Sequence, residues 1–209
     1  DGKHNIISIV RDKISLDKQA AQKATISTEN DGVARKIGVS TLPAFYEDIE
    51  ARRKGDKDYR SASRDVAKLL KELKQEKVDG ILVDLRNNGG GSLSESIDLT
   101  GLFVGKGPVV QQRNAKGEIK IESDNLSTPE WKGPLGVLIN RGSASASEIF
   151  AAAIQDYDRG VVIGEPSFGK GTVQTVVNLD EVAQNSKPEF GELKFTVAQF
   201  FRVNGGTTQ

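Results

Sequence analysis

The stretch SASASEIFAAAIQDYDRGVVIGEPSFGKGTVQ, residues 143–174, decides how this chain is interpreted. Its alanine-rich first half predicts a helix to about residue 157, and VVIGE and GTVQTVVNL predict strands after it. Ser145 is therefore expected at the start of a helix and Lys170, between two glycines, at the start of a strand. A serine and a lysine in these places are candidate partners in a hydrolytic reaction.

The sequence before this stretch alternates strand and helix patterns. Residues 61–77 have the spacing of an amphipathic helix, and GILVDL (80–85) and LGVLIN (135–140) are apolar runs typical of buried strands. Ser92 and Glu95 form a capping box that opens another helix. This alternation predicts an α/β layered domain. Further strands are expected at 5–10, 23–29, 109–114, 118–123 and 193–203, the last closed by a turn at 204–206, with 30–36 as a linker. IGVSTLPAFY (37–46) begins another strand, which Pro43 must end or pass at a sheet edge.

Composition excludes several classes of site. The 29 Lys and Arg residues balance 29 Asp and Glu residues, so no global field favours nucleic acid. Cysteine is absent and His4 is the single histidine, which excludes disulfides, thiolate metal sites and histidine clusters. We expect no cofactor and no membrane span, because the apolar runs are short.

Ser145 has two interpretations. With Glu148 it forms S-x-x-E, so it can simply cap the helix. The same position presents its hydroxyl beside the N–H of Ala146, as a nucleophile beside an oxyanion donor requires. Ser143 and Ser147 are weaker candidates because one precedes the turn and the other is rotated away on the helix.

A nucleophilic serine needs a base, and His4 lies in a remote segment. A lysine can accept the proton near neutral pH if burial without a counter-charge lowers its pKa well below about 10.4. Lys170 lies among glycines with no acid within the flanking four residues. Strand alternation places Thr172 and Gln174 on its face, where the Gln174 amide can orient the amine. An ordinary solvated lysine is the alternative.

Two further elements are candidates for the same site. RNNGGG (86–91) leads into a helix N-terminus, and Gly90 and Gly91 can bring backbone N–H groups to an oxyanion, although such a turn can also serve only to reverse direction. Asp156 falls on nearly the same helix face as Ser145 and can brace the site, or bond to solvent or Arg159.

GEPSFGKGT (164–172) also fits a phosphate-binding loop. That motif needs a helix after its lysine, whereas TVQTVVNL is β-branched and predicts a strand. A nucleotide-binding enzyme is therefore retained only as the alternative function.

RGSASASEIFAAAIQDY, GEPSFGKGTVQ and VDLRNNGGGSLSESIDLTGLF resemble the tail-specific, or carboxyl-terminal processing, serine protease family. The resemblance covers residues 6–209 and implies a ClpP/crotonase-like layered core. It implies a serine endopeptidase that degrades or processes proteins recognised by their C-terminal tails, here apolar ones, with an adaptor protein as a possible partner. It also implies an exported, periplasmic protein without a cofactor. A non-catalytic scaffold of the same fold that binds C-terminal tails is a further alternative.

Residue by residue, the resemblance implies Ser145 as nucleophile, Lys170 as general base and Gln174 as its orienting partner. Ala146 with Gly90 or Gly91 would form the oxyanion hole, and Asp156 matches an aspartate implicated in activity in some members.

The resemblance also predicts how the chain is divided. Residues 1–31 are expected to be the last strands of a PDZ module and a linker. Residues 32–209 are expected to form a catalytic core that is truncated at its C-terminal end, and the exported chain to have lost its signal peptide.

Overall fold

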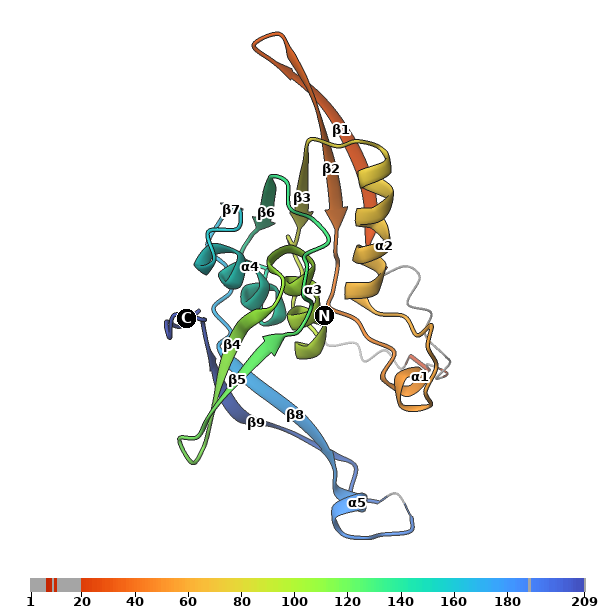
Figure 1. The fold of residues 1–209 in the computed structure, drawn as a ribbon. Helices are drawn as coiled ribbons and strands as arrows, with labels where there is room; N and C mark the ends of the chain where they lie inside the picture. Colours follow the sequence, from red (N-terminus) through yellow and green to blue (C-terminus); the bar gives the residue numbers. More distant parts are fainter. Residues whose placement is uncertain (1–6, 9, 11–19, 188, 209) are drawn as a thin grey trace, which may run out of the picture.

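The computed structural model describes residues 7–8, 10, 20–187 and 189–208. Its centre is a five-stranded sheet in the order β1-β2-β3-β6-β7 (Figure 1). Strands β2, β3, β6 and β7 run parallel to one another, and β1 pairs antiparallel with β2. The strands are β1 Gln22–Asn30, β2 Val33–Thr41, β3 Gly80–Asp84, β6 Leu135–Ile139 and β7 Val161–Gly164.

Helices cover one face of this sheet. They are α2 Ala62–Gln75, α3 Leu93–Val104 and α4 Ala146–Asp156. Val83 and Val137 from the sheet share one buried core with Phe103 of α3 and Phe150 of α4. The two phenylalanine rings meet edge to face, with centroids 5.7 Å apart. The predicted helices at 61–77 and after Ser92 and the two buried strands are confirmed.

A second, antiparallel sheet packs on the other side of α3 and α4. Its order is β5-β4-β9-β8, and its strands are β4 Gly107–Asn114, β5 Ile119–Asp124, β8 Thr172–Asn178 and β9 Glu192–Phe201. Val110 and Phe200 of this sheet form a smaller buried cluster with Ile149 and Ala153 of α4. Because α3 and α4 bury residues toward both sheets, they form a middle layer, and the predicted α/β layered architecture is confirmed.

The N-terminal part differs from the expectation. Asn30 pairs directly with Val33 across a tight turn, so the expected linker at 30–36 is wrong: these residues end β1, form the turn and begin β2. Asp31 and Gly32 both have positive φ, as a two-residue hairpin turn requires. The expected boundary at residue 31 therefore runs through a hairpin of the core sheet. The strand expected at 5–10 lies mostly outside the described residues.

Two short helices, α1 Ile49–Arg53 and α5 Leu179–Val182, complete the fold. Strand β2 ends at Thr41, before Pro43, as expected, and the predicted turn at 204–206 is present, with Arg202 donating from N to the Gly206 carbonyl at 2.7 Å. Among the described residues, no helix is long and apolar enough to cross a membrane.

Candidate active site

Two strand-to-helix turns meet at the carboxyl ends of β3 and β6, which are adjacent parallel strands. The Asn87 N–H donates to Asn140 Oδ1 at 2.8 Å, and Asn140 Nδ2 donates to Asn87 Oδ1 at 3.0 Å. The buried Ser143 hydroxyl donates to the Leu85 carbonyl at 2.8 Å. These bonds hold the turn that carries Ser145 against the glycine turn.

The buried Asn88 is the second link between these turns. Its carbonyl accepts from Ala144 N at 3.0 Å and from the Ser147 hydroxyl at 2.9 Å, and its side chain donates to the Leu42 carbonyl. Sequence reasoning did not single out Asn88. The hydroxyls of Ser143 and Ser147 are buried and hydrogen-bonded to backbone, which leaves Ser145 as the serine of this segment on the cavity wall.

Ser145 is the N-cap of α4 and has φ 59° and ψ −113°. These angles match the first central position of a type II′ turn, which glycine dominates because a side chain is strained there. Glu148 stands at N3, and its carboxylate Oε2 accepts from Ser145 N at 2.7 Å. Ser145 therefore occupies the N-cap position through its backbone, in a strained conformation that an ordinary N-cap in extended conformation does not need.

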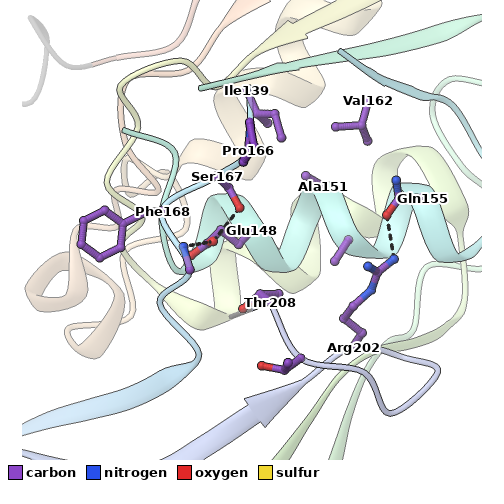
Figure 2. Close-up of a pocket in the computed structure, with 13 residues that line it drawn as sticks. Ile139, Glu148, Ala151, Gln155, Val162, Pro166, Ser167, Phe168, Arg202 and Thr208 are labelled. Atoms are coloured by element: carbon purple, nitrogen blue, oxygen red, sulfur yellow. Dashed lines mark hydrogen bonds between the residues drawn. The ribbon is translucent and has the colours of Figure 1, made fainter. Parts of the chain in front are cut away.

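The Glu148 carboxylate also connects Ser145 to the loop that carries Lys170. Its Oε2 accepts from Lys170 N at 2.9 Å, and its Oε1 accepts from Gly169 N at 2.6 Å and the Ser167 hydroxyl at 2.7 Å. Figure 2 shows Glu148 projecting from α4 toward this loop. Glu148 as a whole residue is only 3% exposed. The sequence predicted Glu148 only as a helix cap, because its loop partners are distant in the chain.

A cavity of about 420 Å³ brings the predicted residues together. It is lined by Gly89, Gly91, Ser92, Leu93, Ser145, Ala146, Ile149, Lys170, Thr172, Val173, Gln174, Lys194 and Phe200. Thr172 and Gln174 share this wall as expected, and Val173 joins them because a β-bulge follows it. Lys194, which the sequence analysis did not single out, lies on the neighbouring strand β9.

Gly90 and Gly91 differ in their backbone bonds. Gly90 N already donates to Asn88 Oδ1 at 2.9 Å, and Gly90 O accepts from Phe45 N at 2.9 Å. Ser92 N donates to Phe45 O at 2.8 Å, so Gly91 stands between two ladder bonds and its own N–H points away from Phe45. Gly91 lines the cavity, whereas Gly90 packs beneath it, against Ser145 and Ala146 N.

Asp156 does not line this cavity. Its carboxylate accepts from Arg202 Nη2 at 2.5 Å and from Asn204 Nδ2 at 3.0 Å, and its side chain is 5% exposed. Arg159, the partner considered from the sequence, donates instead to three backbone carbonyls, those of Phe103, Trp131 and Gly133. Asp156 therefore attaches the end of α4 to the turn after β9.

A second cavity, of about 440 Å³, lies along α4 beyond Glu148 (Figure 2). Ile139, Ala151 and Val162 contribute apolar surface, and Gln155 accepts from Arg202 Nη2 at 2.8 Å. Ser145 and Lys170 do not line it. The two cavities have similar volumes, so size does not identify the candidate active site. The first cavity is the candidate because Ser145 and Lys170 line it.

Residues 36–209 match peptidase family S41. The chain belongs to this family. It is 45% identical over 208 residues to the tail-specific protease of Haemophilus influenzae, an alignment that covers 100% of this chain and 28% of that protein. It is 37% identical over 162 residues to the carboxy-terminal-processing protease of Bartonella bacilliformis, covering 77% of this chain and 35% of that protein. The chain thus spans about a third or less of the length of these relatives.

Solved structures of S41 peptidases show the same fold. The photosystem II D1 C-terminal processing protease superposes with a TM-score of 0.70 at 28% identity, over 90% of this chain and 45% of that one. Mature CPAF superposes with a TM-score of 0.63 at 17% identity, over 90% of this chain and 47% of that one, and shows the fold alone. The family expected from the sequence is confirmed, and its fold matches these structures.

The phosphate-loop alternative is wrong. A phosphate loop requires a helix directly after its lysine, because the helix N-terminus holds the phosphates. Residues Thr172–Asn178 form strand β8 instead.

Proposed function

We propose that this chain carries the catalytic centre of a serine endopeptidase with Ser145 as nucleophile and Lys170 as general base. The observation that carries the proposal is one cavity lined by both residues, in which Ser145 is held in a strained conformation at a helix N-terminus. Strain of this kind is stored where a side chain must be presented to a reaction. Membership in peptidase family S41 supports the same chemistry.

In the proposed reaction, the neutral Lys170 amine accepts the Ser145 proton as Oγ attacks the carbonyl carbon of a peptide bond. The resulting ammonium gives this proton to the departing amine, and an acyl-enzyme remains. Water then attacks the ester carbonyl while Lys170 accepts a proton from that water, and Ser145 regains its hydrogen as the acid product leaves. Gln174 orients the amine without adding charge.

The oxyanion formed in each step needs two N–H donors. We assign these to Ala146 and Gly91, because Gly90 already donates to Asn88 and Gly91 N–H points away from Phe45. Ala146 is the first residue of α4, whose N–H has no partner within the helix and whose end carries partial positive charge. In this assignment Gly90 is not a donor; because it has no Cβ, it leaves space for Ser145. Asp156 serves by bracing α4 through Arg202.

The substrates are proposed to be proteins recognised by apolar C-terminal tails, in the periplasm, with an adaptor as a further partner. The Haemophilus relative is named a tail-specific protease, which supports recognition of tails. Residues before β1 would then complete a PDZ module, with its boundary before Gln22 rather than at residue 31.

The test is degradation of an unfolded protein with an apolar free C-terminus, together with labelling by a fluorophosphonate. We expect labelling and cleavage in the wild type, and neither in Ser145→Ala or Lys170→Ala. Tail binding without labelling of Ser145 would favour the scaffold alternative. Undiminished cleavage by either variant would refute the assignment of residues.

A further inference from the structure

The cavity that contains Ser145 and Lys170 has a second lysine, Lys194. Lys194 lies on β9 opposite Val176 of β8, and Val176 is the alternate residue after Gln174 on the same strand. Lys194 and Gln174 therefore share one face of the β8–β9 hairpin, and both line the cavity. The hairpin extends this face away from the body of the molecule (Figure 1).

The charges around this cavity are one-sided. Among the described residues that line it, the lysines are Lys170 and Lys194, and none is an aspartate or glutamate. Because the proposed reaction uses the neutral amine of Lys170, Lys194 is the residue left to bind an anion. In the part of the chain that the structure describes, no carboxylate forms an ion pair with Lys194. This contrasts with Lys120, a lysine on the edge strand β5 of the same sheet, which pairs with Glu122 at 2.6 Å.

Apolar side chains surround much of the remaining cavity wall. Leu93, Ile149, Val173 and Phe200 line it. Lys194 itself is exposed on the hairpin, so water and salt partly screen its attraction for an anion, and the effect is largest at low salt. The cavity volume of about 420 Å³ is within the range of sites for small ligands or side chains.

We propose that Lys194 is a specificity-determining residue that binds a carboxylate of the peptide substrate close to the scissile bond. The proposal rests on the proposed function, since it concerns the substrate of the same cavity. The carboxylate can come from an Asp or Glu side chain or from the free C-terminus of a short tail. Lys194 would bind it, while Gln174 on the same face continues to orient Lys170.

The experiment measures binding in a Ser145→Ala background, so that it does not depend on turnover. One neutral, apolar, C-terminally amidated peptide is compared with forms carrying a single Glu, Gln or Lys at successive positions, and with its free-acid form. At low salt we expect one Glu position, or the free acid, to bind about three- to tenfold more tightly than its neutral counterpart. Which form gains affinity identifies the source of the carboxylate.

Matched variants separate Lys194 from a general effect of charge. We expect Lys194→Met to remove the preference and Lys194→Glu to reverse it toward the Lys peptide. Lys120→Met removes an exposed lysine from the same sheet and should keep the preference. Equal affinities for all peptides, a preference that survives Lys194→Met, or no binding of any peptide would overturn the proposal.

Failure of this proposal is distinguishable from failure of the proposed function. Cleavage that requires Ser145 but shows no carboxylate preference would refute the role of Lys194 alone. A carboxylate preference in binding, together with no cleavage and no fluorophosphonate labelling in the wild type, would refute the endopeptidase assignment and retain the role of Lys194.

Discussion

The two turns that form the candidate site both contain backbone with positive φ, but different residue types adopt it. In the turn between β3 and α3, Gly90 and Gly91 beside the cavity have φ 99° and 145°, and Asn87, a residue type that tolerates such angles, has φ 61°. In the turn between β6 and α4, the residue with positive φ is Ser145, at 59°. Glycine adopts such angles freely, whereas serine is strained there. Glycine can occupy the turn whose backbone must approach a substrate. The other turn needs a side chain, and Ser145 therefore adopts a strained conformation.

The helices that follow these turns repeat the comparison. Each begins with a serine N-cap and has a buried glutamate three residues later, Glu95 in α3 and Glu148 in α4. Glu95 accepts from Ser63 N at 2.7 Å and so attaches α3 to α2, within the scaffold. Glu148 attaches α4 to the loop before Lys170. One sequence pattern therefore stabilises the scaffold in one helix and joins the two proposed catalytic segments in the other.

The largest effect is expected from replacing the strained serine. Ser145→Ala and Ser145→Gly should both abolish peptide hydrolysis, with losses of up to about 10⁶-fold, as for other serine nucleophiles. Their stabilities should differ, because glycine relieves the positive φ and alanine does not. We expect Ser145→Gly to have a free energy of unfolding about 1 kcal/mol higher than Ser145→Ala in urea denaturation.

A higher stability of the alanine variant would contradict the strain at Ser145. Hydrolysis by either variant would contradict its role as nucleophile.

Alanine substitutions in the glycine turn should affect stability according to the space available at each glycine. A Cβ on Gly91 would lie 2.2 Å from the Phe45 carbonyl oxygen, and one on Gly90 would lie 2.8 Å from Ser145 Cβ. Because both also have positive φ, Gly91→Ala and Gly90→Ala should each lower the free energy of unfolding by at least about 2 kcal/mol. Gly90→Ala should also suppress fluorophosphonate labelling, since its methyl group would crowd Ala146 N.

Gly89→Ala is the matched control, because a Cβ there meets nothing within 4 Å. It should retain wild-type stability and labelling. A Gly89→Ala variant as unstable as Gly91→Ala would show that the turn as a whole, and not these contacts, limits stability.

The two glutamates should respond differently to conversion to glutamine. Glu148 accepts three backbone N–H groups, from Ser145, Gly169 and Lys170, so an amide NH₂ would face donors it cannot bond. We expect Glu148→Gln to lower the free energy of unfolding by about 2–3 kcal/mol and to reduce labelling of Ser145.

Glu95→Gln is the matched control at the same helix position. Its partners include the hydroxyls of Ser61 and Ser63, which can rotate to accept from an amide. It should change stability by less than about 1 kcal/mol. Equal losses in the two variants would contradict the distinction between a scaffold contact and a contact that positions the catalytic loop.

The sequence predicted the layered fold, because strand and helix periodicities here agree with the buried residues. It also predicted Ser145 at a helix start and Lys170 with Gln174 at a strand start, because such positions are set locally, and all three line one cavity in the structure. It did not predict the three bonds from Ser167, Gly169 and Lys170 to Glu148, the link through Asn88 or the approach of Lys194, since these depend on how separate elements pack. The expected linker at 30–36 failed because Asn, Asp and Gly serve equally in linkers and hairpin turns.

The smallest effect concerns pH. Burial raises the pKa of Glu95, with the negative charge of Glu47 adding to the effect, so its folded-state pKa lies above its unfolded value of about 4.3. A carboxyl of this kind favours folding when it is protonated, and that contribution is lost as pH rises through the folded pKa. The free energy of unfolding of Glu95→Gln minus that of the wild type should therefore increase from pH 4 to pH 7. Urea denaturation of both proteins at the two pH values measures this difference.

Asp84, at the end of β3, should affect the pH dependence of stability in the opposite direction. The Arg86 guanidinium holds the pKa of Asp84 below its usual value, so Asp84 stabilises the fold above about pH 3.9 and loses this contribution as pH falls. The free energy of unfolding of Asp84→Asn should therefore fall relative to that of the wild type as pH rises from 3 to 7. If both variants shifted in the same direction, the difference would reflect the net charge of the protein and not the surroundings of each carboxyl group.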